Sequence, residues 1–368
     1  MTVTIKDVSI DAGVSIKTVS RVINNELNVA ESTKTKVFVS IDKLGFKPNK
    51  SAQSLRKKKS YLAGSVLLID IGGTNIRSAV ADIGSNEIKN VKKQKLDSLD
   101  SFDKILQNFL DKYPHIKHIV FSIAGPKLND SISMTNRKFT VDKSNILRKF
   151  SLDSCHILND WESIGYIFSH LEKNEMKIIN PGKSFNDVAL IVGPGTGLGA
   201  AQIVGKDIVL PTEIGNTLLR IPRLLDELGI PNNSTFNTIE DLISGRGLSR
   251  IYSYFDTTKK SAEEIVATYN QNKYSQKSID IFLVAFSQIL SELALIYMPG
   301  RGIYIMGSLM RTLYQFIDVS IFIDNFLINR KSAHRGILAQ MPIALVEKEM
   351  TCLHGSLNFI NNLNQNLN

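Results

Sequence analysis

The sequence is poor in cysteine and in uninterrupted apolar runs, and both shortages limit the classes of protein to which it can belong. Only Cys155 and Cys352 occur among 368 residues, too few and too far apart for a disulfide framework or a metal knuckle. Two isolated thiols fit a reducing compartment, and we expect neither to take part in chemistry. The first seven residues lack the apolar core of a signal peptide. These shortages predict a cytoplasmic protein.

The longest apolar stretch is interrupted by polar side chains. Residues 279–298 contain Asp280, Gln288 and Glu292, which would be costly inside a bilayer. The stretch therefore predicts a buried or amphipathic helix rather than a membrane span. The length of 368 residues predicts two or three domains. The Asn-rich tail, residues 361–368, is expected to fray.

Positive charge is concentrated near the N-terminus. Residues 1–60 hold twelve Lys and Arg against five Asp and Glu, a net charge of +7 out of +9 for the whole chain. The rest of the chain is therefore nearly neutral. A basic head on a neutral body indicates a polyanionic partner for the head alone.

Three short helical patterns occupy this head, which argues against a solvated lysine-rich arm. The patterns cover residues 5–12, 16–24 and 31–44. Gly13 follows the first, where a turn between two helices needs a permissive backbone. Ser15 can cap the second, and Gly45 can end the third. Helical spacing places Val37 and Val39 in the core. The residues of the second pattern that face outward are Lys17, Thr18, Ser20 and Arg21.

Four segments of the head resemble the DNA-binding domain of lac-repressor-type regulators. They are Thr4–Val8, Ala12–Ser15, Thr18–Val22 and Lys43–Asn49. In that family the second helix lies in the major groove of double-stranded DNA. The residues that the resemblance places at base edges are Ile16, Lys17 and Arg21. Those that it places near phosphates are Ser15, Thr18 and Ser20.

Residues 52–56 resemble the hinge helix of the same family, whose leucine enters the minor groove, and Leu55 would be that leucine. A lone short helix is marginal in water, so the resemblance implies two chains side by side in a homodimer. The usual body of those regulators does not follow, so the dimer contacts must come from the part beginning near Tyr61. Residues 57–59 are either a solvated linker or phosphate contacts. The head could also be a bundle that stabilises the body or binds another protein.

The most informative stretch of the body is Leu67–Arg77, an apolar strand followed by a glycine turn. The strand leads into Asp70, a carboxylate placed to meet a metal bound to phosphate. Gly72 and Gly73 lack Cβ atoms where the backbone turns and its N–H groups can approach phosphate oxygens. The side-chain donors beside them are Thr74 and Asn75. The stretch therefore predicts a nucleotide-phosphate loop.

Further segments of the body place small or polar residues at strand ends and turns. They are Phe121–Pro126, Met134–Asn136, Ile157–Asp160, Ala189–Ala201 and Gly302–Ser308. Ala189–Ala201 contains a second glycine-rich turn, and Glu213–Asn216 and Glu240–Gly245 add carboxylates. Each motif alone is weak, because glycine turns occur by chance and a carboxylate after an apolar run is often a helix cap.

Together, two phosphate loops about 120 residues apart, with Asn159 and Asp160 between them, resemble the bacterial glucokinase family over residues 64–360. The resemblance implies an α/β fold, a two-lobed hexokinase or actin-like (RNase H-like) kinase body behind an all-α helix-turn-helix domain. The implied domains are 1–60 for the head, 61–159 for the small lobe and 160–344 for the large lobe, with residues 345–368 returning to the small lobe. The zinc motif of the related repressor-kinase sugar family is absent, which favours the plain glucokinase branch.

The resemblance also implies roles in phosphoryl transfer, which needs positioning, charge neutralisation and a base for the attacking hydroxyl. Asp160 would be the base, and Asp70 would orient Mg²⁺ directly or through water. The residues expected to bind a hexose are Asn136, Asn159, Asp160, Glu213, Asn216 and Glu240. Those expected to bind ATP are Asp70, Gly72, Gly73, Thr74, Asn75, Gly195, Thr196, Gly197, Gly307 and Ser308. Arg77 either braces the first loop or touches the nucleotide.

Two positions depart from that family. Asn216 replaces a sugar-binding histidine, and Ser308 replaces the second glycine of the adenosine motif. Because the base and both loops remain, we expect an active ATP-dependent hexose kinase, with glucose as the leading substrate, joined to a DNA-binding regulator. One alternative is a sugar-sensing repressor with a weak or inactive kinase body. Another is a metabolic kinase whose head no longer reads DNA.

Overall fold

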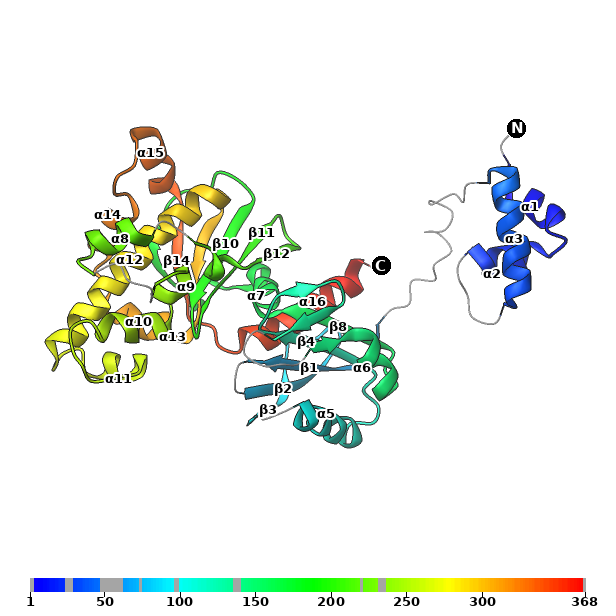
Figure 1. Cartoon of the computed structure of the whole chain (residues 1–368), viewed down its shortest axis with the longest axis horizontal. Coiled ribbons are helices and arrows are strands. Elements are labelled where there is room, and N and C mark those ends of the chain that lie inside the picture. Colours follow the sequence, from blue (N-terminus) through cyan, green and yellow to red (C-terminus); the bar gives the residue numbers. More distant parts are fainter. Residues whose placement is uncertain are drawn as a thin grey trace. The chain divides into compact units, whose positions relative to one another are not determined.

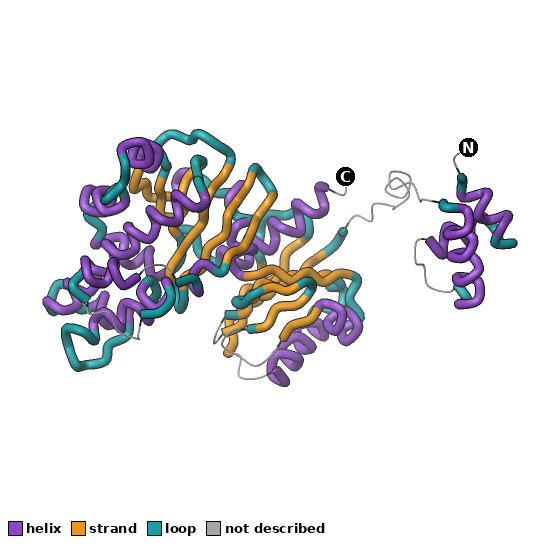
Figure 2. Tube along the Cα trace, turned by 45° about the horizontal axis from the view of Figure 1, so that its top comes forward, coloured by secondary structure: helices purple, strands orange, loops and turns teal. Residues whose placement is uncertain are grey.

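The computed structural model describes residues 3–23, 29–46, 62–72, 75–95, 99–134, 140–218, 221–230 and 236–366. Contacts divide the chain into two compact units, the head before Leu62 and the body Leu62–Asn366. Figure 1 follows the chain from end to end, and Figure 2 separates its helices from its strands. Some predicted features lie outside the described residues, namely the hinge helix 52–56 with Leu55, Gly73, Thr74 and Asn136.

The head is a three-helix unit of α1 (Ile5–Asp11), α2 (Ile16–Ile23) and α3 (Glu31–Leu44). The Ser15 hydroxyl caps α2 by accepting a hydrogen bond from the Thr18 N–H at 3.0 Å. Gly13 and Gly45 both adopt left-handed φ angles, 65° and 63°, where a side chain would be strained. The core residues are Val8, Ala12, Val19, Val22 and Val37.

One predicted core position of the head is wrong. Val39 is 60% exposed, whereas Val37 is fully buried. The face of α3 that packs on the other helices carries Val37, Ile41 and Leu44. These three follow helical spacing, and a residue two positions from Val37 points to nearly the opposite side of the helix.

The small-lobe sheet has the strand order β3-β2-β1-β4-β8. Its strands are β1 (Ser65–Ile71), β2 (Asn75–Asp82), β3 (Lys89–Lys95), β4 (His118–Ile123) and β8 (Ser154–Asn159). A separate small sheet contains β5 (Lys127–Leu128), β6 (Ser131–Ser133) and β7 (Thr140–Asp142). β2 pairs with β1 antiparallel, whereas β1, β4 and β8 run parallel. The carboxyl ends of these three strands therefore meet at one edge.

Helices cover both faces of the small-lobe sheet. Successive β1 residues point to opposite faces and therefore enter different cores. Leu67 and Ile69 enter the core beneath α5 (Leu99–Lys112) and α6 (Lys143–Phe150). Val66 and Leu68 pack instead beneath α16 (Thr351–Asn366). Asp70 continues this second series, so its side chain belongs to the α16 face.

The large-lobe sheet has the order β12-β11-β10-β13-β14-β9. Its strands are β9 (Met176–Asn180), β10 (Val188–Pro194), β11 (Leu198–Val204), β12 (Ile208–Thr212), β13 (Gly302–Ile305) and β14 (Ile343–Val346). Apart from β9, the strand order and pairing directions repeat those of the small-lobe sheet. Each lobe thus presents one glycine hairpin, β1–β2 or β10–β11, at an equivalent place.

The helices of the large lobe build an apolar core on each face of its sheet. They are α7 (Asp160–Gly165), α8 (Ile221–Glu227), α9 (Ile239–Leu242), α10 (Gly245–Tyr252), α11 (Ala262–Ala267), α12 (Lys273–Tyr297), α13 (Ser308–Leu313), α14 (Val319–Phe326) and α15 (Ser332–Gln340). Short 3₁₀ helices span Phe168–His170, Lys173–Glu175, Ile214–Asn216 and Tyr314–Phe316. By length and composition α12 could cross a membrane, but 61% of its apolar window is buried in the body. The predicted buried helix is confirmed.

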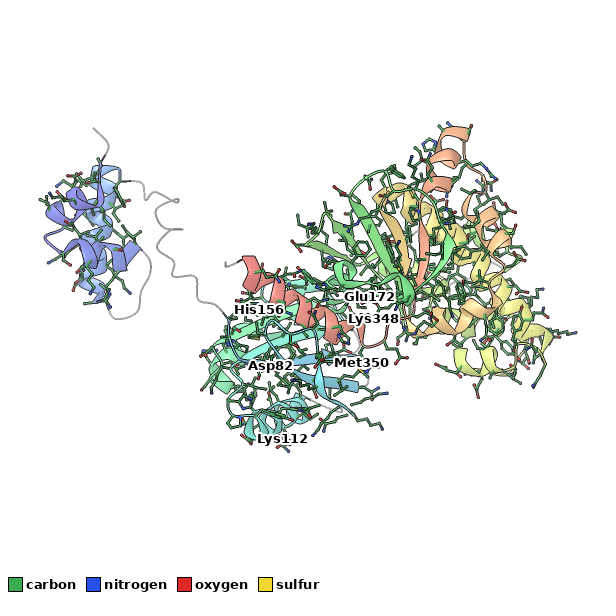
Figure 3. All side chains as sticks on the ribbon, turned by 180° about the vertical axis from the view of Figure 1, so that it is seen from behind. Asp82, Lys112, His156, Glu172, Lys348 and Met350 are labelled. Carbon is green, nitrogen blue, oxygen red and sulfur yellow. The ribbon has the colours of Figure 1, made fainter. Side chains whose placement is uncertain are left out.

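α7 and α16 connect the lobes. α7 covers the large-lobe sheet, α16 covers the small-lobe sheet, and the two helices pack against each other. Their contact is close: the Ser163 hydroxyl donates to the Cys352 carbonyl oxygen at 2.7 Å, and Gly355 faces the Ser163 backbone with no room for a Cβ. The chain reaches α16 past Lys348 and Met350 (Figure 3). The Lys348 ammonium pairs with Glu175 at 2.7 Å.

The predicted fraying of the tail is wrong for its described part, because α16 continues to Asn366. The Asn361 amide donates to the Ser85 carbonyl oxygen at 2.8 Å and accepts from the Gly84 N–H at 2.7 Å. Asn364 accepts from the Leu62 N–H at 3.0 Å. Polar asparagines thus hold the helix to the start of the small lobe.

Candidate active site

Three polar side chains gather where the parallel strands of the small lobe end. Asp70 on β1 is paired in register with Ser122 on β4, and Asp160 directly follows β8. Ser122 is fully buried, and its hydroxyl has no hydrogen-bond partner among the described residues. The carboxyl ends of parallel strands are where α/β proteins bind ligands.

Asp70 is held by the neighbouring strand of its hairpin. It is 6% exposed, and Arg77 lies opposite it on β2 with Nη1 3.1 Å from Oδ2. Burial raises the pKa of Asp70, and the Arg77 charge opposes that shift. Of the two roles open to Arg77, the described contacts favour bracing the loop. Gly72 donates its N–H to the Asn75 carbonyl oxygen at 3.0 Å, which closes the turn.

Asn159 fixes the strand-to-helix turn that presents Asp160. Its Oδ1 caps α7 by accepting from the N–H groups of Trp161 at 2.9 Å and Glu162 at 3.2 Å. Its Nδ2 donates to the Gly125 carbonyl oxygen at 2.9 Å. The amide that the sequence predicted to bind sugar therefore also orients the residue after it.

The predicted base has a strongly shifted pKa. Burial, the negative charge of Asp70 and, more weakly, that of Glu213 raise the pKa of Asp160 to about 7. Asp70 lies on β1, Asp160 begins α7 directly after β8, and Glu213 follows β12, so three separate elements bring these carboxylates close enough to interact. A carboxylate with a pKa near neutrality suits a general base.

Trp161, which directly follows Asp160, contacts the second hairpin. Its indole ring lies against Gly193 and Gly199, which are paired across β10 and β11, and a Cβ on either glycine would collide with the ring. α7 therefore rests directly on the hairpin whose turn is the second predicted phosphate loop. The sequence reasoning missed this contact, although Trp161 is the only tryptophan and follows Asp160 directly.

The turn of the second hairpin, Gly195–Gly197, is tightly closed. The Gly195 N–H donates to the Gly197 carbonyl oxygen at 2.7 Å, and the Gly245 N–H donates to the Gly195 carbonyl oxygen at 2.8 Å. A cavity of about 800 Å³ opens beside the turn. It brings together the predicted nucleotide residues Gly195, Thr196 and Ser308 with Arg246, which the sequence reasoning missed. Gly307 precedes Ser308 with φ 103°, which favours glycine.

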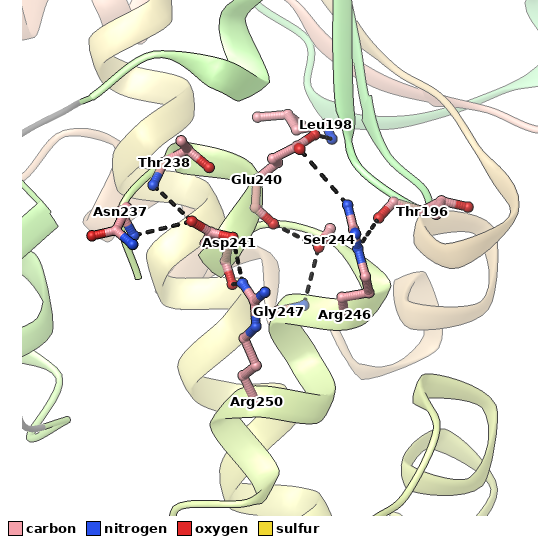
Figure 4. A network of polar contacts seen from close by, with 10 residues as sticks. All are labelled: Thr196, Leu198, Asn237, Thr238, Glu240, Asp241, Ser244, Arg246, Gly247 and Arg250. Atoms are coloured by element: carbon pink, nitrogen blue, oxygen red, sulfur yellow. Dashed lines mark hydrogen bonds and ion pairs between the residues drawn. The ribbon is translucent and has the colours of Figure 1, made fainter. Parts of the chain in front are cut away.

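Glu240 lies beside this turn, next to Leu198 (Figure 4). Its Oε2 accepts from the Leu198 N–H at 3.3 Å, and a Cβ at Gly197 would collide with it. Glu240 Oε2 also lies 3.1 Å from the Cβ position of Gly215, two residues after Glu213. Desolvation by the surrounding protein and the charge of Glu240 raise the pKa of Glu213, although Glu213 stays exposed to solvent. Glu213 precedes the 3₁₀ helix Ile214–Asn216, and Asn216 at the end of that helix is exposed to solvent.

Cys352, on the first turn of α16, also belongs to this region and was missed. Its Sγ lies 4.0 Å from the Asp160 carbonyl oxygen. Burial and the charges of Asp70 and Asp160 raise the pKa of its thiol well above the ordinary value. The thiol is therefore protonated at neutral pH and is a poor nucleophile.

The outward face of α2 is the candidate DNA interface of the head. Ser15, Ile16 and Lys17 are exposed, and Ile16 exposes 44% of an apolar side chain. The partly buried neighbours on this face are Thr18, Ser20 and Arg21. An exposed helix with cationic, hydroxyl and apolar side chains has the chemistry needed for groove contacts.

Two like lobes, each with a glycine hairpin, and a carboxylate of raised pKa beside both define a phosphotransferase body of the hexokinase and actin-like class. The family model for Glucokinase matches residues 67–363, and that for bacterial regulatory proteins of the lacI family matches residues 4–49. The chain therefore belongs to the glucokinase family and carries a lacI-type helix-turn-helix head. Its body is an ATP-dependent hexose kinase.

Individual relatives agree with this assignment. A glucokinase of Nostoc sp. is 25% identical over 334 residues, covering 78% of this chain and 96% of its own. The solved structure of Balamuthia mandrillaris glucokinase in complex with glucose has a TM-score of 0.67 at 19% identity, covering 86% of this chain and 99% of its own. A ROK family glucokinase from Streptomyces griseus, in complex with glucose and AMPPNP, has a TM-score of 0.58 at 16% identity, covering 80% and 98%.

Proposed function

We propose that the body phosphorylates glucose at its 6-hydroxyl and that the head makes this kinase a transcriptional regulator. The observation that carries the enzymatic part is the place of Asp160 directly after β8, where burial and the nearby charges of Asp70 and Glu213 raise its pKa to about 7. The glucose complexes of two structural neighbours support the choice of sugar. The protein works in the cytoplasm as a homodimer.

In this proposal Asp160 accepts the proton of the attacking sugar hydroxyl. The groups that hold the sugar beside it are Asn136, Asn159, Glu213, Asn216 and Glu240. Several acceptors aimed at hydroxyls give specificity, since a sugar lacking one hydroxyl leaves one of these groups unpaired. The groups that hold the nucleotide phosphates are Gly72, Gly73, Thr74, Asn75, Gly195, Thr196 and Gly197, and those near the nucleoside are Gly307 and Ser308.

The donor set at the strand ends fits Mg²⁺. Among the described residues no group of three or more His, Cys, Asp or Glu could hold a metal alone. Mg²⁺ is usually held by one or two carboxylates, and phosphate oxygens and water complete its shell. Asp70 would supply that carboxylate, and the unpartnered Ser122 hydroxyl beside it suits a bound water. The ion would neutralise phosphate charge during transfer.

An ADP-release assay across several hexoses tests the enzymatic proposal, with Asp160→Asn as the control. Wild type should turn over glucose fastest. Loss of the base should lower kcat by about 10²–10⁴-fold without unfolding the chain. If wild type and Asp160→Asn are equally inert while both bind glucose, the second candidate holds, a sugar-sensing repressor without useful turnover. The amide at Asn216 is the observation that favours that candidate.

A mobility-shift titration on the protein's own upstream DNA tests the regulatory proposal. Affinity should depend on sequence, and glucose with ATP should change it. Indifference to both ligands would remove the coupling between kinase and operator. Binding that follows salt but not sequence would instead favour a metabolic kinase whose head no longer reads DNA.

A further inference from the structure

Arg246 stands where the second phosphate turn meets a helix. It is the second residue of α10, whose first N–H, at Gly245, is bonded to Gly195. The Arg246 Nε donates to the Thr196 carbonyl oxygen at 3.1 Å. The guanidinium is thus attached to the turn by one of its five N–H donors, and the others can reach a ligand.

The Arg246 side chain borders the 800 Å³ cavity beside the turn. The rest of its wall includes Ser249, Glu263, Val266, Ser308 and Leu309. Among these described wall residues Arg246 supplies the positive charge, at the end where the glycine turn lies. The N-terminus of α10 adds its partial positive charge at the same place. An anionic group at this end would meet a guanidinium, a helix terminus and a glycine turn together.

The ion pair between Arg246 and Glu240 is long and solvent-exposed. Its Nη2 lies 3.7 Å from Glu240 Oε1, and 55% of the Arg246 side chain is exposed (Figure 4). A long and exposed ion pair contributes little to stability, so it can be exchanged readily. Glu240 meanwhile touches the turn through Leu198 and Gly197 and neighbours Glu213 electrostatically. One carboxylate therefore lies between the predicted sugar groups and the predicted phosphate groups.

We propose that Arg246 binds the phosphates of the nucleotide and that Glu240 controls its availability. Without sugar, Glu240 pairs with Arg246. With sugar bound, Glu240 accepts a sugar hydroxyl instead and releases the guanidinium to the phosphates. The inference rests on the proposed function, since it takes Glu240 as a sugar ligand. It makes sugar and nucleotide each strengthen the binding of the other, as reciprocal linkage requires.

Calorimetric titration of the full chain with ADP and with adenosine, each with and without glucose, tests the proposal. Arg246→Gln should weaken ADP binding by about ten- to a hundred-fold, as expected for a charge-assisted contact, and leave adenosine binding unchanged. It should also abolish the gain in ADP affinity that glucose produces in wild type. Glu240→Gln should remove that gain as well, because the ion pair that glucose breaks is absent.

Arg250→Gln is the matched control, since Arg250 lies one turn further along α10 and pairs with Asp241 (Figure 4). It should leave the ratio of ADP to adenosine affinity unchanged. Arg246→Lys keeps the charge but loses the planar fork, so it should recover part of the ADP affinity. This conservative variant keeps the test decisive if Arg246→Gln folds poorly.

Equal losses of ADP and adenosine binding in Arg246→Gln would show that Arg246 only braces the turn, and would overturn the proposal. Unchanged ADP binding, or a glucose effect that persists in both variants, would overturn it too. Turnover of glucose by wild type is measured separately. A wild type that fails to phosphorylate glucose but shows Arg246-dependent ADP binding coupled to glucose would contradict the proposed function and support this inference.

Discussion

Asp160 shows how neighbours determine the chemistry of one residue. The pKa of its carboxyl is raised first by burial, then by Asp70, which lies on β1, far from Asp160 along the chain. The same surroundings also lower the stability of the folded chain once Asp160 is ionised. A carboxyl that keeps its proton in the folded chain to about pH 7, but loses it near pH 4 when unfolded, binds more protons in the folded state between these values. Stability therefore falls as pH rises through this window.

A pH profile of kcat/KM for glucose checks this account. Below about pH 7 Asp160 is neutral and cannot accept a proton, so kcat/KM should fall about ten-fold for each further pH unit. Asp160→Asn should show no such limb. It should also unfold at higher urea concentration than wild type at pH 7, because it removes a buried charge. A flat wild-type profile between pH 5 and 8 would contradict the assignment of Asp160 as the base.

At the scale of elements, the close pair α7 and α16 governs how the lobes meet. α7 carries Asp160 and Trp161 at its start, and α16 carries Cys352 at its start, so both helices begin at the site. Their contact uses Ser163, Gly355 and Ser356, whose small side chains allow the backbones to approach. A change of spacing between these helices would displace Asp160, the proposed base, relative to the second hairpin.

Gly355→Ala tests the importance of this spacing. The added methyl would meet the Ser163 backbone, and such overpacking typically costs about 1–3 kcal/mol. We expect a lower urea midpoint for the body and a lower kcat. Gly336→Ala is the control, because Gly336 lies inside α15 with open space around its Cβ position. The free energy of unfolding of that control should rise by about 0.5–1 kcal/mol, since alanine favours helices. Equal effects in both variants would contradict close packing at Gly355.

At the scale of the whole molecule, the chain joins two units with separate cores. The head core contains Val8, Val19 and Val37, and the cluster around them consists of head residues among those that the structure describes. Each described unit therefore has the apolar contacts needed to fold cooperatively by itself.

Calorimetric unfolding of the full chain checks this independence. Glucose at a hundred times its Kd should stabilise the body by about 2.7 kcal/mol, because it binds only the folded state. The body transition should therefore rise by several degrees, while the head transition stays in place. Operator DNA should instead raise the head transition and leave the body transition in place. A glucose shift shared equally by both transitions would contradict separate units, and no shift at all would contradict a glucose site.

The sequence alone determined the parts of this protein that depend on neighbours along the chain. The helices of the head, with Gly13 and Gly45 at their ends, and the Gly195–Gly197 turn follow from local backbone preferences and caps. Tertiary structure decided which residues meet. Three contacts join segments that are separated along the chain: the Arg77–Asp70 ion pair, the packing of Trp161 on the second hairpin and the Arg246–Glu240 ion pair. The exposure of Val39 and the anchoring of Asn361 were also settled there, because burial and pairing depend on packing that no local pattern records.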